Sequence, residues 1–442
     1  MNFHLKLLKV AIGSIIFCLG AGVVAWAQDL TYDRYAALLE ENPESSTAKK
    51  IASHFLVYPF ELVKWPVDQT LLYIEKHYLE KKVEWIYDKI QEQGIKPSGT
   101  IVSLGGLGGG LEVDFVRLTR LREHYPDLTT RGWYQWTNDV NMEVGSELGL
   151  QRIGETGFRT IGNFKYSNRP EEHFYGIGPD TSAGEGTSYR MESTDLETLF
   201  GYNWGPSLSA DAKFGYHNVN ITNGEDGGRG IIDTVFRPQT ISGLAGDELI
   251  DLKLELQRDT RNRSENSTKG GLAKFVWSYY EGVDNSKARY FKYEAEMSRF
   301  LRLGADRRVL AFRLYGEHND EIGDRYVPFH QMAKLGGYGA YPRLSRTLRG
   351  FDFNRFFDES SALMNLEYRY TIWEYRDFKL DSIVFWDEGQ VFGEFSDFQF
   401  KDFRESYGLG FRVSLANVVL LTAVVAHGDE GTNLYVKTGA PF

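Results

Sequence analysis

The chain has 442 residues and a formal net charge of −11 at pH 7, and it contains no basic cluster with interleaved aromatic side chains. This balance argues against a nucleic-acid partner, which requires a basic surface. The composition is rich in glycine, with 46 residues, and in aromatic side chains, with 29 Phe, 26 Tyr and 9 Trp. Such a composition is typical of many short strands with tight turns and aromatic girdles.

Residues 1–27 have the features of a secretory signal peptide. Two lysines precede an apolar stretch over residues 10–24, and Ala25-Trp26-Ala27 forms a small-x-small cleavage site. A transmembrane anchor is the alternative interpretation. The only cysteine, Cys18, lies in this segment, so the predicted mature chain has no thiol and forms no disulfide.

Residues 28–98 are predicted to form a periplasmic helical segment. Asp68 can cap the start of a helix, and Gly94 suits its end. Apolar residues recur at helical spacing between them, at Leu72, Leu79, Val83, Ile86 and Ile90. This helix either docks on the rest of the protein or serves as a linker, and the sequence leaves both roles open.

From Gly99 onward the residue pattern of the sequence is typical of a β protein. The glycine-rich run 105–110 lacks the Lys-Ser/Thr pair of a phosphate-binding loop and favours a weakly side-chained strand. Apolar and polar residues then alternate in many segments, including 196–204, 252–257, 291–298 and 407–415. A soluble sandwich also alternates. However, it would not need a signal peptide together with a terminal aromatic strand.

The stretch 348–389 carries the most specific pattern in the chain. Within it, residues 363–372 alternate, and Glu367 lies on the polar face of the predicted strand. The following strand places Phe385, Asp387 and Gly389 together on one face.

Carboxylates enclosed in a narrow lumen need a cation. A guanidinium is always charged and can engage two carboxylates through its fork. Arg349, next to a glycine that permits a sharp backbone turn, is therefore the candidate partner of Glu367 and Asp387.

These residues resemble the BamA/TamA superfamily of outer-membrane barrels, in particular its bacterial surface antigen domain. In that family an (L/V)-R-G-(F/Y) loop folds back into the barrel. Its arginine meets the aspartate of an F-x-D-x-G strand and a glutamate on the neighbouring strand. Segment 173–180 is similar to a further F-(F/Y)-G-I-G motif of the family. The resemblance implies a lock in the lumen formed by Leu348, Arg349, Gly350, Phe351, Glu367, Phe385, Asp387 and Gly389.

The resemblance and the alternation together predict an all-β transmembrane fold over residues 99–442, an antiparallel outer-membrane barrel with an inward-folded loop. At roughly 21 residues for each strand with its loop, this length gives about 16 strands. Assembly proteins of this superfamily usually carry periplasmic POTRA modules before the barrel. Residues 28–98 show no strand pattern around their helix, so we expect no POTRA module.

The last strand resembles the signal by which outer-membrane barrels are recognised for insertion. Its outward positions are predicted to include Leu434, Val436 and Phe442, with Gly439 between them. The barrel assembly machinery is the partner that this resemblance implies.

No pattern for catalysis, a metal ion or a cofactor is present. The nine histidines form no H-x-x-x-H or H-E-x-x-H pair, and no G-x-S-x-G occurs. We therefore expect no enzyme activity and no cofactor.

Two functions are compatible with these features. The resemblance implies a barrel for protein insertion or translocation in the outer membrane of a Gram-negative bacterium. Its weak seam would lie between a first strand at 108–115 and a last strand at 434–442. Its partners would be outer-membrane lipids and unfolded outer-membrane or secreted clients. The alternative is a passive pore or structural surface protein with the same fold.

Overall fold

The computed structural model describes residues 94–437 and 439, except 103–105, 120–123, 138–140, 227, 238–239, 265, 305–306, 339–345, 376–377 and 416–417. The chain divides into two units, 1–89 and 90–442, and every described residue belongs to the second. The predicted signal peptide and nearly all of the predicted helical segment 28–98 lie outside the described residues. None of the helices in the described part has the length and apolarity needed to cross a membrane.

In the part of the chain that the structure describes, sixteen antiparallel strands form the wall, and each pairs with the next along the chain. A two-residue strand, β8 (Gly230–Ile231), runs parallel to the start of β6. The wall strands are β1 (Ile95–Val102), β2 (Gly106–Asp114), β3 (Leu128–Thr137), β4 (Met142–Leu150), β5 (Phe158–Phe174), β6 (Thr187–Trp204), β7 (Leu208–Asn223), β9 (Gly246–Asp259), β10 (Gly270–Gly282), β11 (Arg289–Arg302), β12 (Arg308–Glu321), β15 (Ser360–Tyr375), β16 (Phe378–Phe392), β17 (Arg404–Leu415), β18 (Val418–Gly428) and β19 (Gly431–Lys437).

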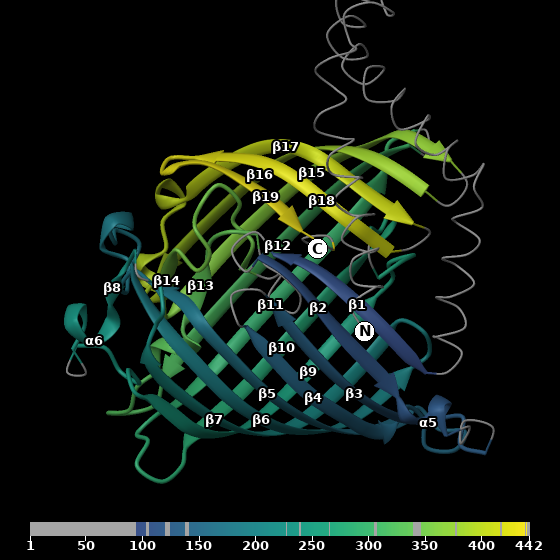
Figure 1. Cartoon of the computed structure of the whole chain (residues 1–442), viewed down its shortest axis with the longest axis horizontal. Helices are drawn as coiled ribbons and strands as arrows, with labels where there is room; N and C mark the ends of the chain where they lie inside the picture. The colour runs from purple at the N-terminus through teal and green to yellow at the C-terminus, as the bar shows by residue number, and fades with distance from the viewer. Residues whose placement is uncertain are drawn as a thin grey trace, which may run out of the picture. The chain divides into compact units, whose positions relative to one another are not determined.

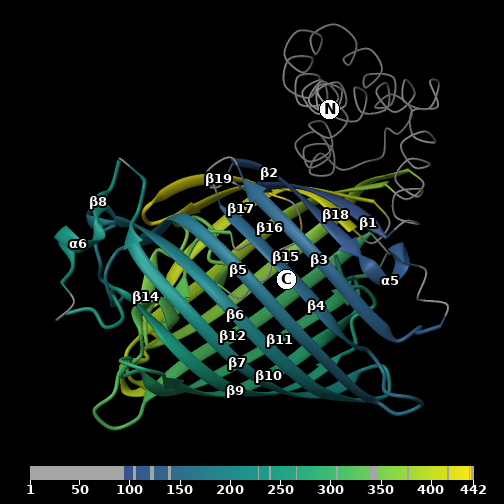
Figure 2. The ribbon, with the colours of Figure 1, turned by 60° about the horizontal axis from the view of Figure 1, so that its bottom comes forward.

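The strands lie side by side, inclined and curved into a barrel (Figures 1 and 2). Alternation along each strand decides which side chains enter the lumen, as β17 illustrates. Its Arg412 and Ser414 are buried, whereas Leu409 and Phe411 are exposed on the outer face. An apolar outer face and a polar interior are the arrangement that a barrel needs in lipid. The prediction of an all-β antiparallel barrel of about 16 strands with an inward-folded loop is therefore confirmed.

The first strand differs from the prediction. It is β1, which begins at Ile95, before the expected boundary at residue 99, and the run predicted as the first strand is β2. Phe115, expected at the end of that run, instead begins the short helix α5 (Phe115–Leu118). Pro97 and Gly99 weaken the strand signal of β1, but a proline is tolerated in a strand at a sheet edge.

The first and last strands, β1 and β19, lie next to each other. β1 forms its ladder with β2, and β19 forms its ladder with β18. Among the described residues, no backbone ladder joins β1 to β19. The wall therefore has a seam at this position.

The two ends of the barrel differ. At the long-loop end, β5–β6, β7–β9, β12–β15 and β16–β17 are joined by segments 175–186, 224–245, 322–359 and 393–403. These segments contain the helix α6 (Ile232–Val235), the hairpin of β13 (Ala333–Leu335) and β14 (Phe356–Asp358), and the 3-10 turns η2 (Ala183–Glu185), η3 (Phe329–Gln331), η5 (Phe395–Asp397) and η6 (Phe400–Asp402). The opposite end, where α5 lies, is called the short-turn end (Figure 1).

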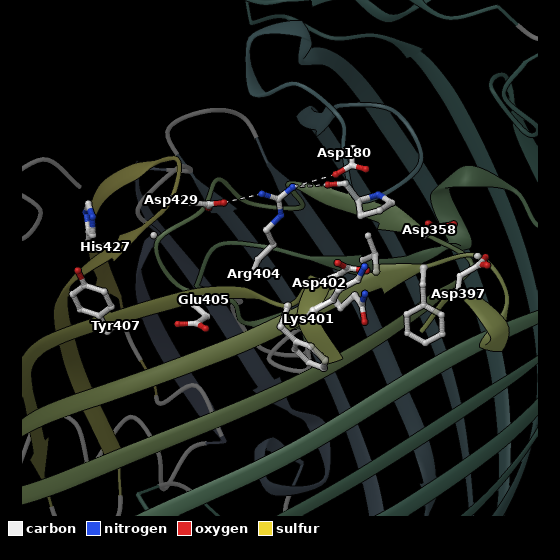
Figure 3. A pocket seen from close by; sticks show the side chains of 17 residues that line it. Asp180, Asp358, Asp397, Lys401, Asp402, Arg404, Glu405, Tyr407, His427 and Asp429 are labelled. Atoms are coloured by element: carbon white, nitrogen blue, oxygen red, sulfur yellow. Dashed lines mark hydrogen bonds and ion pairs between the residues drawn. The ribbon is translucent and has the colours of Figure 1, made fainter. Parts of the chain in front are cut away.

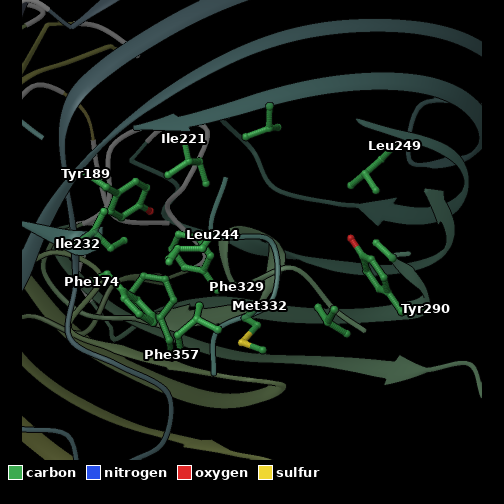
Figure 4. Packing of buried hydrophobic residues seen from close by; sticks show 14 of the residues in the cluster. Phe174, Tyr189, Ile221, Ile232, Leu244, Leu249, Tyr290, Phe329, Met332 and Phe357 are labelled. Atoms are coloured by element: carbon green, nitrogen blue, oxygen red, sulfur yellow. The ribbon is translucent and has the colours of Figure 1, made fainter. Parts of the chain in front are cut away.

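The largest apolar core lies inside the long-loop end, where these segments pack on the strand ends (Figure 4). At its centre, the ring centroid of Phe174 lies 4.8 Å from the ring centroid of Phe329 and 5.0 Å from that of Phe357. The other residues labelled in the figure are Tyr189, Ile221, Ile232, Leu244, Leu249, Tyr290 and Met332. This core fixes segment 322–359, which carries the predicted arginine, within the barrel.

Candidate functional site in the barrel lumen

Arg349 lies in the segment between β12 and β15, residues 322–359, which we call the lumen loop. The ladder between β13 and β14 and an isolated bridge between Gly337 and Leu348 hold this loop in a folded-back conformation. Leu348, Arg349 and Phe351 each have 0% exposure. The loop therefore carries its arginine into an enclosed environment.

The guanidinium of Arg349 binds both predicted carboxylates. Its Nε and one terminal nitrogen lie 2.7 Å from Asp387 Oδ2 and 2.6 Å from Asp387 Oδ1, a two-pronged contact. The other terminal nitrogen donates to Glu367 Oε2 at 3.0 Å. All three residues have 0% exposure. We call Arg349, Glu367 and Asp387 the lumen lock.

The neighbouring charges outweigh the effect of burial on Arg349. Burial alone would lower the pKa of the guanidinium, but Asp387 and then Glu367 hold it above its ordinary value. The guanidinium of Arg349 is therefore charged although it is enclosed, and its stability depends on the two carboxylates.

The F-x-D-x-G pattern of β16 supplies three different parts of the site. Phe385 places its ring 3.5 Å from the guanidinium carbon of Arg349, and Asp387 pairs with the charge. Gly389 leaves room for the loop, because a Cβ there would lie 2.9 Å from Leu335 Cδ1 and 3.2 Å from Leu348 Cδ2.

Gly350 permits the close approach of the lumen loop to the wall. Its φ is +93°, a conformation that side chains disfavour. A Cβ at this position would also lie 2.9 Å from Ser406 Cβ and 3.0 Å from the backbone nitrogen of Gly428. The L-R-G-F sequence therefore needs its glycine for both backbone conformation and space.

Two further arginines complete the site, and sequence reasoning missed both. Glu367 Oε1 accepts hydrogen bonds from Arg369 Nε at 2.6 Å and from Arg412 at 3.0 Å. Asn365 donates to Asp387 Oδ1 at 2.9 Å. Arg412 was visible in the sequence only as a polar residue on the inward face of its strand.

A turn from the short-turn end also enters the lumen. Asn266, between β9 and β10, donates to Asp381 Oδ2 at 3.1 Å, and its Oδ1 accepts from Arg412 at 3.2 Å. Ser267 accepts from Arg369 through its carbonyl oxygen at 3.1 Å. The lumen network is thus bonded to segments from both ends of the barrel.

The last strand is bonded directly to the lumen loop. The hydroxyl of Tyr435 accepts from the backbone nitrogen of Gly350 at 3.1 Å and donates to the carbonyl oxygen of Phe351 at 2.7 Å. Asn433 donates to the carbonyl oxygen of Gly350 at 3.0 Å. The lumen lock and the edge of the seam therefore share a hydrogen-bonded connection.

The predicted insertion-signal strand is placed only in part. Leu434 is 66% exposed, Val436 is half-buried, and Gly439 donates its N–H to the carbonyl of Val419 at 3.3 Å. Phe442 lies outside the described residues. Tyr435 and Lys437, between the outward positions, are buried.

Comparison with known proteins identifies the family and the fold of the chain. Residues 130–439 match the model of the Omp85 superfamily domain. No curated protein matches the chain.

Many solved structures match the fold of this chain, and two of them illustrate the likeness. The structure of BamA from Haemophilus ducreyi lacking POTRA domains 1–3 is 15% identical, with a TM-score of 0.57 over 78% of this chain and 69% of that one. CdiB from Escherichia coli is 10% identical, with a TM-score of 0.53 over 78% of this chain and 62% of that one. Since the family match covers most of the chain, this protein belongs to the Omp85 superfamily of outer-membrane β-barrels.

Proposed function

We propose that the protein inserts or translocates other proteins at the outer membrane, by opening the seam between β1 and β19. An incompletely paired strand edge can template a client strand by adding it to the sheet. The observation that carries this proposal is the bond from Tyr435 to the lumen loop, which lies on the strand that borders the seam. Opening of the seam and release of the lumen loop are thereby coupled.

The lengths of the strands at the seam also support this mechanism. β19 has 7 residues and β1 has 8, whereas β6 has 18. Strands this short could exchange only few backbone hydrogen bonds across the seam, and no ladder joins β1 to β19 among the described residues, so the seam opens at a lower cost than a joint between long paired strands. The long-loop end would face the cell surface, and the exposed apolar outer wall would contact lipid.

The passive pore has less support. A pore needs a continuous water path, but the centre of the lumen holds the buried arginines Arg349, Arg369 and Arg412, each bonded to buried Glu367. The turn with Asn266 meets this network from the other end.

The test uses the chain from Gln28 reconstituted in liposomes, with an unfolded small outer-membrane barrel as client. Cysteines scanned along β1 and β19 identify a pair that oxidises across the seam. The matched control is a disulfide between positions 425 and 434, which face each other within the β18–β19 ladder. We expect faster client folding than with empty liposomes. The seam disulfide should abolish this acceleration, and the control disulfide should preserve it. No acceleration together with steady ion conductance would reject insertion and favour the pore.

A further inference from the structure

We infer that the segment joining β16 to β17, residues 393–403, is a membrane anchor. It seats phenylalanine rings among the acyl chains of bilayer lipid at the long-loop end. We call this segment the Phe loop. The inference requires a barrel in a membrane but not the insertion activity proposed above.

The Phe loop continues an aromatic belt on the outer wall. Ring contacts run from strand to strand across β10, β11 and β12. The ring centroids are 5.6 Å apart for Tyr279–Phe291, 6.4 Å for Phe291–Tyr293, 6.2 Å for Tyr293–His318 and 4.3 Å for His318–Phe395. Such belts mark the boundary between lipid and water. The last contact joins the belt to the Phe loop.

On the next two strands the belt continues through Phe392, which faces Ser360 in the β15–β16 ladder and contacts Phe395 at 6.3 Å. At the rim of β15 and β16, the outward positions are Ser360, Ala362, Gln390 and Phe392, and Phe392 is only 6% exposed. Ser360 and Gln390 are only 0% and 3% exposed. Farther along the same face of β16, Val384 is 58% exposed. Ser360 also donates to the carbonyl of Gly393 at 2.9 Å. The outer wall is therefore covered at the rim, where the Phe loop begins.

The Phe loop has an apolar and a polar side. Phe398 is half-buried and contacts Phe392 and Phe400 at 5.4 and 5.1 Å, whereas Phe395 and Phe400 are 69% and 86% exposed. Asp397, Lys401 and Asp402 instead line a cleft of about 970 Å³ that also holds Arg404 and Asp429 (Figure 3).

This division fits a lipid boundary. Phenylalanines as exposed as Phe395 and Phe400 are unfavourable in water, while a loop that carries exposed rings beside charged residues suits an interface. Continuity with the lipid-facing aromatic belt favours bilayer lipid over a protein partner as the occupant. Its acyl chains would cover Phe395 and Phe400, and the charged residues of the cleft would remain in water.

The test compares two adjacent positions of the Phe loop. Phe400→Cys and Lys401→Cys are made in the chain from Gln28, which has no other cysteine. Each variant is labelled with an environment-sensitive fluorophore and reconstituted in phosphatidylcholine vesicles with or without brominated acyl chains. Both positions are exposed, so neither change removes a buried contact, and heat-modifiable electrophoretic mobility verifies folding. Asp180→Cys, whose native side chain is 95% exposed at the same end, is the aqueous reference.

We expect the label at position 400 to emit at shorter wavelength and to be quenched several-fold more by brominated lipid than labels at 401 and 180. Equal quenching at all three positions would overturn the proposal. A blue-shifted label at position 400 that brominated lipid does not quench would also overturn it, because a protein surface would then cover the ring.

Discussion

Tyr435, in the strand that borders the seam, accepts a hydrogen bond at 3.1 Å from the backbone nitrogen of Gly350, the residue that follows the arginine of the lumen lock. The two residues are 85 positions apart in the chain. Movement of β19 away from the wall must break this bond or pull the lumen loop with it. The strand at the edge of the barrel and the loop inside its lumen are therefore connected by hydrogen bonds.

Tyr435→Phe tests this connection. The change keeps the ring but leaves the Gly350 N–H and the Phe351 carbonyl without their partner, at a cost of about 1–3 kcal/mol. We expect the barrel to unfold at a lower temperature in a heat-modifiability assay. We also expect the backbone amides at the seam to exchange their hydrogens more readily. Tyr407→Phe, at a tyrosine that is 60% exposed on β17, should change neither. If the two variants behaved alike, the hydroxyl of Tyr435 would contribute neither to the stability of the barrel nor to the closure of the seam.

Arg349→Ala should destabilise the barrel by about 3–5 kcal/mol, because it leaves buried carboxylates without their cation. All three residues of the lumen lock have 0% exposure, so the energy expected of a buried ion pair applies here and the smaller energy of a surface ion pair does not. Denaturant unfolding of the reconstituted barrel measures the loss. Arg349→Lys should restore little of it, since an ammonium cannot reproduce the two-pronged contact.

Arg404→Ala is the matched control for the lumen lock. Arg404 pairs with Asp429 at 2.7 Å, but Asp429 is 49% exposed, so its loss should cost only about 0–1 kcal/mol. If Arg349→Ala and Arg404→Ala had similar effects, the lumen lock would not be a stabilising site.

Gly350→Ala should disrupt the approach of the lumen loop to the wall. The added Cβ would meet Ser406 and the backbone of Gly428, in addition to the strain of φ +93°. Gly205→Ala separates these causes, since Gly205 also has a positive φ, +69°, but a Cβ there would meet nothing within 4 Å. We expect a clearly larger drop in unfolding temperature for Gly350→Ala, and equal drops would rule out the steric contribution.

Glu359 gives the long-loop end a defined pH response. Burial and the carboxylates of Glu321, Asp358 and Glu394 raise the pKa of Glu359 from its ordinary 4.5 to about 7. The folded state binds the proton of Glu359 more tightly than the unfolded state does. Protonated Glu359 therefore stabilises the folded protein, and this contribution is fully present below its ordinary pKa. It is lost as the pH rises through about 7.

Glu359→Gln removes that response. Relative to the variant, the wild-type protein should lose stability between about pH 5 and about pH 8, as measured by the midpoint of heat modification. Asp180→Asn, at an exposed carboxylate of the same end, is the control. Parallel pH profiles for wild type and Glu359→Gln would contradict the assignment.

The sequence by itself determined the class of the fold and the centre of the site. Alternation is a local property of each strand, so 363–372 and 407–415 predict their inward and outward faces without knowledge of their neighbours. The L-R-G-F and F-x-D-x-G patterns likewise identified Arg349 and Asp387, because charge that is enclosed in a lumen requires a partner of opposite sign.

Only the tertiary structure decided what surrounds that centre. Arg412 bonds to Glu367 of the lumen lock, Asn266 bonds to Arg412, and Tyr435 bonds to the backbone of Gly350 and Phe351. These contacts join distant segments, and they depend on strand register and on how the loops fold inward. The identity of the first strand was also decided by pairing, because Pro97 hides the strand pattern of β1 while its ladder with β2 forms at a sheet edge. Local sequence records the side-chain pattern of a strand, but pairing partners and enclosed loops follow from long-range packing.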